Sequence, residues 1–315
     1  MSLSLDRVLN DLPENLSDIW GNETVRFSHA LQDTGLFSDT ALADLIGHHP
    51  DDLLYVSTMD NQGHDIRSWH VGRLGSARGE GIIEAVSKGP IWVNARNVNE
   101  TDPRFKQIEE TLFSQLEDAV PGLKTFKRRL GILLSSPKTR VFYHMDVPGQ
   151  GLIQLRGSKR VYVYPPEAPF LSRESLEDVV LNVTEEEIPY DPAFDNYAEV
   201  FDIEPGDMLT WRLNGPHRID NHDCLNVSMT VEYWTDDIRR SYAVNYANAV
   251  LRHFVGVKAK STALSGPGFW AKAGLAAAVK YSGLAQRKQH KLMVDFEVDP
   301  ASPTGMVPIQ PQEAA

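Results

Sequence analysis

The sequence predicts a mainly β protein with flanking helices, in which the strands form a sandwich or a barrel. Seven short apolar or aromatic segments follow one another between residues 130 and 234. Turn sequences such as Pro148-Gly149, Pro205-Gly206 and Asn214-Gly215-Pro216 lie between them. Short strands at this spacing favour a sandwich or barrel over a parallel α/β sheet. The composition, with 42% hydrophobic and 23% charged residues in a chain of 315, is that of an ordinary globular protein.

The N-terminal segment, residues 1–128, combines helical and extended patterns, and we expect it to pack on the strands that follow. Ser38 is a suitable N-cap for a helix that runs through Leu45, because its side-chain oxygen can accept a hydrogen bond from a free amide. The clearest helix is predicted over 102–120, where the apolar residues fall on one stripe. Two strands are also predicted in this segment, at 53–58 and 90–96.

The central segment, residues 129–236, is the predicted core. Within it, residues 166–199 are polar and include three consecutive glutamates, so we interpret them as an insertion or long loop. The strands are predicted at 130–136, 139–146, 152–157, 159–165, 200–204, 207–212 and 225–234.

The C-terminal segment, residues 237–315, returns to a helical pattern and ends in a short tail. Residues 251–294 contain eight lysines or arginines and no acid, although the net charge of the chain is −12. An acidic body therefore carries a basic segment, and the acidic total argues against a protein that coats nucleic acid.

The single cysteine, Cys224, excludes an intramolecular disulfide and a cysteine-rich zinc site, and it is typical of a reducing compartment. Acidic residues stand near the start of the chain, where a signal peptide needs a basic region followed by an apolar one. No segment approaches the roughly 20 apolar residues of a membrane span. We expect a cytoplasmic protein.

A candidate metal site begins with the sequence His144-Met145-Asp146. Alternate residues of a strand project from the same face, so the imidazole and the carboxylate should converge. Such a pair is often no more than a hydrogen-bonded pair, but His217 follows a later predicted strand and could supply a third ligand. Two histidines and one carboxylate are the facial set of non-haem Fe(II) oxygenases, whereas a structural zinc site needs a fourth ligand. His222, in the same turn region, is the rival to His217.

The order and spacing of these residues resemble the cupin-like, jumonji-C (JmjC) type of Fe(II)- and 2-oxoglutarate-dependent oxygenase, and the asparaginyl-hydroxylase-type members in particular. In those members a lysine follows the first histidine by fifteen residues, as Lys159 follows His144 here. The second histidine follows a glycine by eleven, as His217 follows Gly206, and a tryptophan follows that histidine by seventeen, as Trp234 does. The resemblance covers about residues 129–236, and it implies a double-stranded β-helix (jelly-roll, cupin) core.

The resemblance also implies roles for individual residues. It makes His144, Asp146 and His217 the Fe(II) ligands and Lys159 the partner of the distal carboxylate of 2-oxoglutarate. Gln150 falls where such members have an amide side chain that touches the cosubstrate. The family often has a threonine three residues before the first histidine, where this chain has Val141. The missing hydroxyl could come from Thr230, Ser228 or Tyr143.

The substrate is less clear from the sequence. Several arginines near the ligand segments suggest an anionic group on the substrate, although they could equally be exposed rim residues. Glu232 occupies a position where the resembling proteins have an asparagine, so substrate handling is expected to differ. The candidate substrate residues are Arg140, Trp211, Arg212, Arg218 and Glu232.

The sequence thus predicts an oxygenase that hydroxylates a C–H bond of an unidentified small molecule, glycan- or lipid-linked molecule or protein side chain, releasing succinate and CO2. The alternative is a non-catalytic cupin that binds a metal as a sensor or regulator. Helices after the barrel often form a dimer interface in this family, so segment 251–294 could form a homodimer. Its cations and aromatic residues could instead contact an anionic lipid or glycan, which would place the protein at the membrane periphery; nucleic acid is the least favoured partner.

Overall fold

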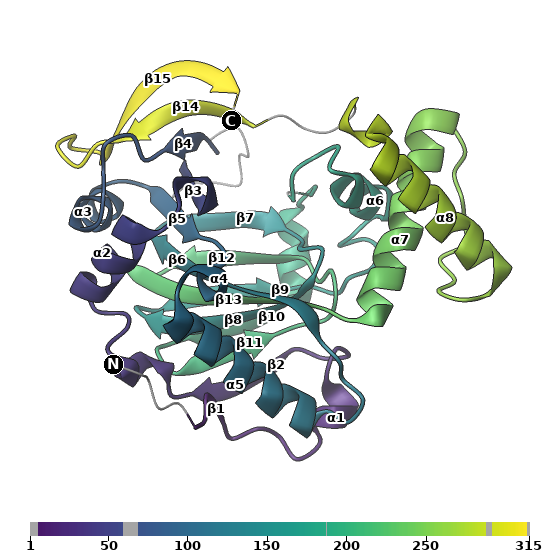
Figure 1. The fold of residues 1–315 in the computed structure, drawn as a ribbon, viewed down its shortest axis with the longest axis horizontal. Coiled ribbons are helices and arrows are strands. Elements are labelled where there is room, and N and C mark those ends of the chain that lie inside the picture. The colour runs from purple at the N-terminus through teal and green to yellow at the C-terminus, as the bar shows by residue number, and fades with distance from the viewer. Residues whose placement is uncertain (1–5, 59–68, 187, 288–291, 314–315) are drawn as a thin grey trace.

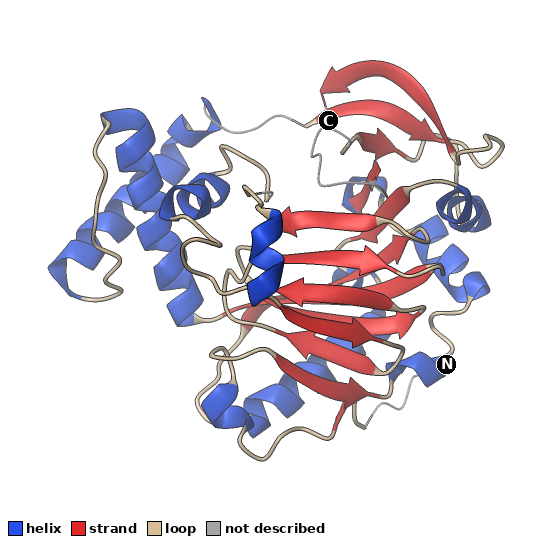
Figure 2. Ribbon diagram, turned by 180° about the vertical axis from the view of Figure 1, so that it is seen from behind, coloured by secondary structure: helices blue, strands red, loops and turns tan. Residues whose placement is uncertain are grey.

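Two β-sheets packed against each other form the body of the protein (Figure 1, Figure 2). The computed structural model describes residues 6–58, 69–186, 188–287 and 292–313. In spatial order the larger sheet contains β1 (Leu9–Asn10), β2 (Val25–His29), β11 (Asp207–Thr210), β8 (Gly149–Arg156), β13 (Asn226–Trp234), β6 (Phe126–Ser135), β5 (Ile91–Ala95), β3 (Leu54–Thr58), β4 (Val71–Arg73), β14 (Met293–Val298) and β15 (Met306–Glu313). The smaller sheet contains β10 (Glu199–Ile203), β9 (Lys159–Val163), β12 (His217–Asn221) and β7 (Arg140–His144).

Apolar side chains from both sheets fill the space between them. Leu152 of β8 and Leu209 of β11 belong to one buried cluster with Val161 of β9 and Ile219 of β12. Successive strand residues face opposite sides, so the neighbours of Leu152 and Leu209 in each strand point away from this cluster. The predicted mainly β architecture is confirmed, and its interior lies between the two sheets.

A long helix covers the outer surface of the larger sheet. Helix α5 (Pro103–Ala119) begins at Asp102, whose carboxylate accepts a hydrogen bond from the Arg104 amide at 2.8 Å. Its buried stripe belongs to one apolar cluster with the residues of β13 that face away from the interior; the stripe is Phe105, Ile108, Leu112 and Leu116, and the β13 residues are Val227, Met229 and Val231. The helix predicted over 102–120 is therefore confirmed, and its packing fixes which face of β13 looks inward.

The remaining N-terminal helices are distributed along the larger sheet, and α4 packs against its central strand β6 (Figure 1). Helix α2 (Asp39–His48) has the predicted cap, because Ser38 accepts a hydrogen bond from the Ala41 amide at 3.3 Å. The others are α1 (Leu16–Ile19), α3 (Glu80–Lys88) and α4 (Val98–Thr101), with 3₁₀ turns at Leu31–Thr34 and Asp51–Leu53.

Residues 166–199 are not a long loop, while their interpretation as an insertion stays a prediction. They contain α6 (Arg173–Leu181), capped by Ser172, and a 3₁₀ turn at Pro192–Tyr197. The polar composition concealed this helix because only one face of it, with Val179, Val180 and Leu181, is buried. Its acidic residues form ion pairs with the basic C-terminal segment.

Strands β12, β14 and β15 were not predicted either. Strand β12 has the polar sequence His-Arg-Ile-Asp-Asn, which hides its period-two pattern. Strands β14 and β15 form a hairpin from the tail of the chain (Figure 1). Strand β14 pairs in parallel with β4, which belongs to the N-terminal segment. The larger sheet thus takes strands from the N-terminal, central and C-terminal segments.

The C-terminal helices stand beside the barrel with α6 (Figure 1, Figure 2). Helix α7 (Asp236–Val250) continues into a π-helical turn, Leu251–Val255, and packs against both α6 and α8 (Gly266–Ser282); a 3₁₀ turn, Leu284–Arg287, follows. None of the helices in the described ranges combines the length and apolarity needed to cross a membrane.

Candidate metal centre

The three expected metal ligands lie together at one end of the space between the sheets. His144 is the last residue of β7 and His217 is the first of β12, and they are direct partners in the antiparallel ladder. Asp146 stands two residues beyond the end of β7. Their candidate ligand atoms all lie within 4.8 Å of one another, and His217 Nε2 is 3.3 Å from an Asp146 carboxylate oxygen. This set can hold a divalent transition metal and leave one side of the ion open.

Backbone carbonyls fix which imidazole nitrogen faces the centre. His144 Nδ1 lies 2.7 Å from the Phe142 carbonyl oxygen, and His217 Nδ1 lies 3.1 Å from that of Gly215. A carbonyl only accepts hydrogen bonds, so each Nδ1 donates and each Nε2 keeps its lone pair. Hydrogen bonds of this kind orient metal-binding histidines.

Burial of the cluster also favours a bound cation. Desolvation lowers the pKa of His217 well below its usual value, and the nearby His144 lowers it further. Desolvation raises the pKa of Asp146, an effect that His144 partly opposes. A neutral imidazole is the form that binds metal, and a divalent cation would compensate the buried carboxylate. The donor set therefore fits a metal ion.

A buried ammonium group lies on the same inner surface. Lys159 is 2% exposed, and its side chain projects from β9 with those of Val161 and Val163, of which Val163 is the cross-strand partner of His217. Burial lowers the pKa of Lys159 to about 7, and within the described part of the chain only the Cys224 thiol opposes this shift. Because an unpaired buried ammonium is unfavourable, the position fits a carboxylate of a bound ligand.

Three more expected site residues face the interior from the larger sheet. Gln150 of β8 is the cross-strand partner of Glu232 of β13, and Thr230 is the partner of the interior residue Leu152. The pKa of Glu232 rises to about 7 because of burial and the Asp146 carboxylate, while Arg129 and Arg96 oppose the rise. Glu232 thus adds a second carboxyl group near the metal ligands.

Of the other proposed sources of a hydroxyl, neither is free to face the cosubstrate. Tyr143 donates its hydroxyl hydrogen to the Phe170 carbonyl and belongs to an apolar cluster outside the barrel. Ser228 donates to Gln154 Oε1 at 2.7 Å. The Thr230 hydroxyl makes only a long, weak hydrogen bond, 3.5 Å, to the Gly131 carbonyl. Of the three hydroxyls, it is therefore the best placed to bond the cosubstrate.

The arginines proposed to contact substrate lie away from the centre. A β-bulge in β7 between the partners of His217 and Ile219 shifts the alternation, so Arg140 pairs with Asp220 rather than facing inward with His144. Arg218 has 5% side-chain exposure, forms ion pairs with Asp195 and Asp220 at 2.6 and 2.8 Å, and lies over the Tyr162 ring.

Arg212 is half-buried and lies 3.4 Å from Glu167, so it too pairs with a carboxylate of the protein. Trp211 is different: it is 7% exposed, and its ring centroid is 4.5 Å from that of His217. Of the five candidate substrate residues, the structure brings Trp211 and Glu232 to the centre. Strand alternation alone could not reveal the bulge that turns Arg140 away.

The rival ligand His222 lies at the far end of β12 from His217. Its Nδ1 is 2.9 Å from the Ser158 hydroxyl, and its Nε2 is 3.5 Å from Asp202. The described residues contain a three-ligand cluster with His217 and not with His222.

Residues that the sequence did not identify also border the centre. Gly131 is required by close packing, because a Cβ there would lie 2.7 Å from Thr230 Oγ1 and 2.9 Å from Asn94 Oδ1. Asn214, recognised only as a turn residue, donates from its side chain to the backbone of Asp146. Its position in the sequence, three residues before His217, was the only indication that it lies near the metal ligands.

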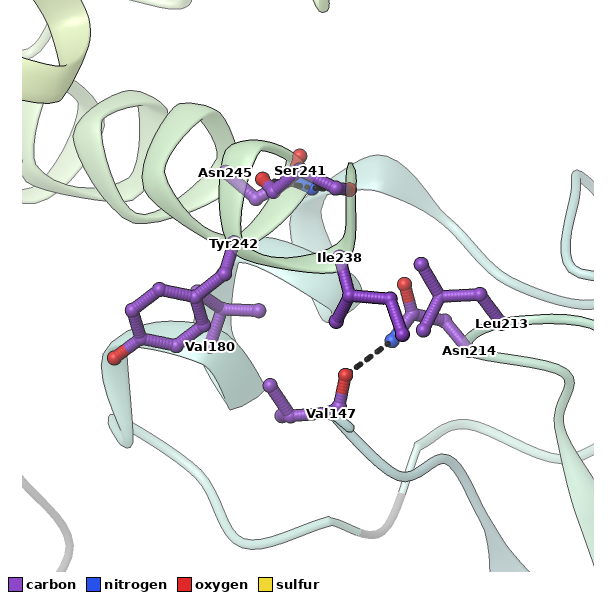
Figure 3. Close-up of a pocket in the computed structure, with 8 residues that line it drawn as sticks. All are labelled: Val147, Val180, Leu213, Asn214, Ile238, Ser241, Tyr242 and Asn245. Atoms are coloured by element: carbon purple, nitrogen blue, oxygen red, sulfur yellow. Dashed lines mark hydrogen bonds between the residues drawn. The ribbon is translucent and has the colours of Figure 1, made fainter. Parts of the chain in front are cut away.

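A small cavity of about 10 Å³ lies beside the loop that carries Asp146 (Figure 3). Helix α7 forms one wall, and the loops after β7 and β11 form another. Its lining residues are Val147, Val180, Leu213, Asn214, Ile238, Ser241, Tyr242 and Asn245.

No family model and no curated protein matches the chain. Among solved structures, one of Escherichia coli YcfD has 16% sequence identity and a TM-score of 0.51, covering 90% of this chain and 71% of that one. A second, described as YcfD, a ribosomal oxygenase from Escherichia coli, in complex with cobalt and 2-oxoglutarate, has 16% identity and a TM-score of 0.50, covering 92% and 74%. The chain therefore shares the fold of these YcfD structures, and the predicted cupin core is confirmed.

Proposed function

We propose that the chain is an Fe(II)- and 2-oxoglutarate-dependent oxygenase that hydroxylates a C–H bond of its substrate. The observation that carries the proposal is the combination of the His144, Asp146 and His217 cluster with the buried ammonium of Lys159 on one inner surface, where no described residue forms an ion pair with it. A metal-binding module has no need of the second feature, because a buried ammonium is unfavourable unless an anion binds to it.

His144, Asp146 and His217 would hold Fe(II), and Lys159 would bind the distal carboxylate of 2-oxoglutarate. When bound, the iron and 2-oxoglutarate supply the oxidising chemistry, in which O2 is consumed, succinate and CO2 are released and one oxygen atom enters the substrate. The Phe142 and Gly215 carbonyls would keep each Nε2 available to hold the metal. Gln150 and Thr230 offer an amide and a hydroxyl for hydrogen bonds to the cosubstrate.

The buried surroundings support a reaction shielded from water. Trp211 lies against His217, and the apolar cluster between the sheets continues from it into the interior. Exclusion of water strengthens the electrostatic interactions of Lys159 and of the metal ligands and limits side reactions.

The substrate is proposed to contact Trp211 and Glu232, since these two candidates border the metal ligands. Arg140, Arg212 and Arg218 each lie within ion-pair distance of a carboxylate of the protein, and an anionic substrate stays a prediction. The solved complex of YcfD with cobalt and 2-oxoglutarate supports the cofactor assignment by analogy of fold.

The proposal is tested by adding 2-oxoglutarate to the anaerobic Fe(II) protein and recording the visible spectrum. We expect a weak metal-to-ligand charge-transfer band in the wild-type protein and none in His144→Ala. Absence of the band in the wild type, or its persistence in the variant, would overturn the assignment.

Succinate release across a panel of metabolites, peptides and glycans then identifies the substrate. Metal binding without a band and without succinate would instead support the alternative, a cupin that binds metal as a sensor.

A further inference from the structure

We propose that Asn214 is a positioning residue that clamps the Asp146 loop to the loop leading into His217, an inference that rests on the proposed metal centre. The side-chain amide Nδ2 of Asn214 donates to the Asp146 carbonyl at 2.8 Å and contacts the Val147 carbonyl at 3.4 Å. Figure 3 shows this amide directed at the Val147 carbonyl. One side chain thus joins the two loops that carry the ligands.

Asp146 needs such support because it lies outside the sheet. Strand β7 ends at His144, so the ladder with β12 does not hold the backbone of Asp146. The preceding residue, Met145, is held by a hydrogen bond from its amide to the Glu186 carbonyl at 3.1 Å. The Asn214 amide supplies the support at Asp146 itself.

Only a small cavity of about 10 Å³ separates this loop from helix α7, and Val147 and Asn214 both line it (Figure 3). The side-chain hydrogen bonds of Asn214 therefore hold the loop at the point where it faces helix α7.

The backbone of Asn214 suits this role. Its φ is +57°, in the left-handed region that asparagine and glycine adopt most readily. The next residue, Gly215, provides the carbonyl that accepts from His217 Nδ1. The same short loop therefore fixes the position of Asp146 through a side chain and the orientation of His217 through a backbone carbonyl.

The consequence is that Asn214 sets the distance between two ligands. His217 Nε2 lies 3.3 Å from an Asp146 carboxylate oxygen, and Asn214 joins the loops that carry these two residues. Loss of groups that orient metal ligands typically weakens metal affinity about ten- to a hundredfold. Asn214 touches none of the atoms that would bind metal, so its effect would be exerted through the position of Asp146.

The test is a Co(II) titration of the metal-free full-length protein, followed by the visible absorption of bound Co(II). Asn214→Asp keeps the shape and replaces the donor with an acceptor that faces two carbonyls. Asn214→Gly keeps the left-handed backbone and removes the amide. We expect the dissociation constant for Co(II) to rise about ten- to a hundredfold in the Asp variant and less in the Gly variant, with altered absorption in both.

A matched control is Asn182, which also has a left-handed backbone, with φ of +59°, but ends α6. Asn182→Asp and Asn182→Gly should bind Co(II) as the wild type does. Wild-type affinity and absorption in both Asn214 variants would refute the clamp alone. A wild-type protein that binds no Co(II) would refute the metal centre and the clamp together. Thermal unfolding of the metal-free variants shows whether each is folded, and a folded Gly variant suffices for the comparison.

Discussion

Lys159 illustrates how one buried charge links structure to ligand binding. Replacing it with methionine keeps most of its volume and removes the ammonium. A hydrogen bond to a charged group contributes about 1.5–3 kcal/mol. We therefore expect Lys159→Met to bind 2-oxoglutarate about ten- to a hundredfold more weakly than the wild type. Isothermal titration calorimetry of the Co(II)-loaded protein measures this loss. Lys138→Met is the control, because Lys138 is exposed and paired with Asp223.

The same residue predicts a pH dependence of ligand binding. The pKa of Lys159 is about 7 in the free protein, and a bound carboxylate would raise it. Binding at pH 8 should therefore take up a proton, and affinity should fall by at most about tenfold per pH unit above 7. Calorimetry in two buffers of different ionisation enthalpy measures the uptake. Equal proton uptake by wild type and Lys159→Met would contradict the assignment.

Glu232 makes a separate prediction for the metal-free protein. Its pKa is about 7 when folded and near 4.5 when unfolded, so the folded state favours the protonated form. The resulting stability is present at low pH and is lost as pH rises from about 4.5 to 7. Relative to Glu232→Gln, the wild type should lose about 1–3 kcal/mol over this range.

Urea unfolding of the two proteins at pH 5 and pH 8 measures that difference. A difference in the free energy of unfolding that is the same at both pH values would show that Glu232 is not desolvated as the structure indicates.

The ligands could be predicted because strand alternation and spacing act over a few residues. His144 and Asp146 needed only a two-residue repeat, and the resemblance supplied His217. Arg140 could not be placed in the same way, because a β-bulge depends on the partner strand β12. Asn214 was missed because its hydrogen bonds reach 68 residues along the chain.

At the level of elements, prediction succeeded where the buried face was apolar. Helix α5 has a continuous apolar stripe and was found almost to the residue. Strand β12 and helix α6 were missed because their exposed or ion-paired faces are so polar. In β12 both Arg218 and Asp220 lie on the face away from the interior, where they pair with each other.

The acidic face of α6 also accounts for part of the basic segment 251–294. Arg252 forms ion pairs with Glu177 and Asp178 at 3.0 and 2.7 Å, and Lys258 pairs with Glu174 at 3.2 Å. These cations therefore stabilise the packing of α6 against the C-terminal helical segment. The homodimer and the contact with an anionic lipid or glycan stay predictions.

Arg252→Met tests the contribution of this ion-pair network. The Arg252 and Glu177 side chains are 16% and 5% exposed, so the variant leaves a buried carboxylate without its partner. We expect a loss of about 2–4 kcal/mol in the free energy of unfolding, measured in urea. Lys258→Met is the control, since both members of its pair are more than half exposed, and it should cost less than about 1 kcal/mol. Equal losses in the two variants would contradict this account.

At the scale of the whole molecule, the larger sheet joins distant parts of the chain. Strand β14 lies beside β4, where a Cβ at Gly72 would overlap the ring of Phe296. The sequence did not predict this pairing because the two strands are more than 200 residues apart and each is short. The hairpin contributes no residue to the cluster of His144, Asp146 and His217, so it offers a way to change stability without removing a metal ligand.

Metal binding should stabilise the protein as a whole, because the ligands come from two strands and a loop that unfolding separates. A metal at 100 times its dissociation constant adds about 2.7 kcal/mol to the free energy of unfolding. We expect this increment from Co(II) in the wild type, its loss with a chelator, and its absence in His217→Ala. Phe296→Ala should lower the baseline by about 3–5 kcal/mol, because Phe296 is 4% exposed, yet keep the full increment. If Co(II) stabilised Phe296→Ala less than it stabilises the wild type, Co(II) would bind elsewhere, because a site built from β7 and β12 takes no ligand from the hairpin.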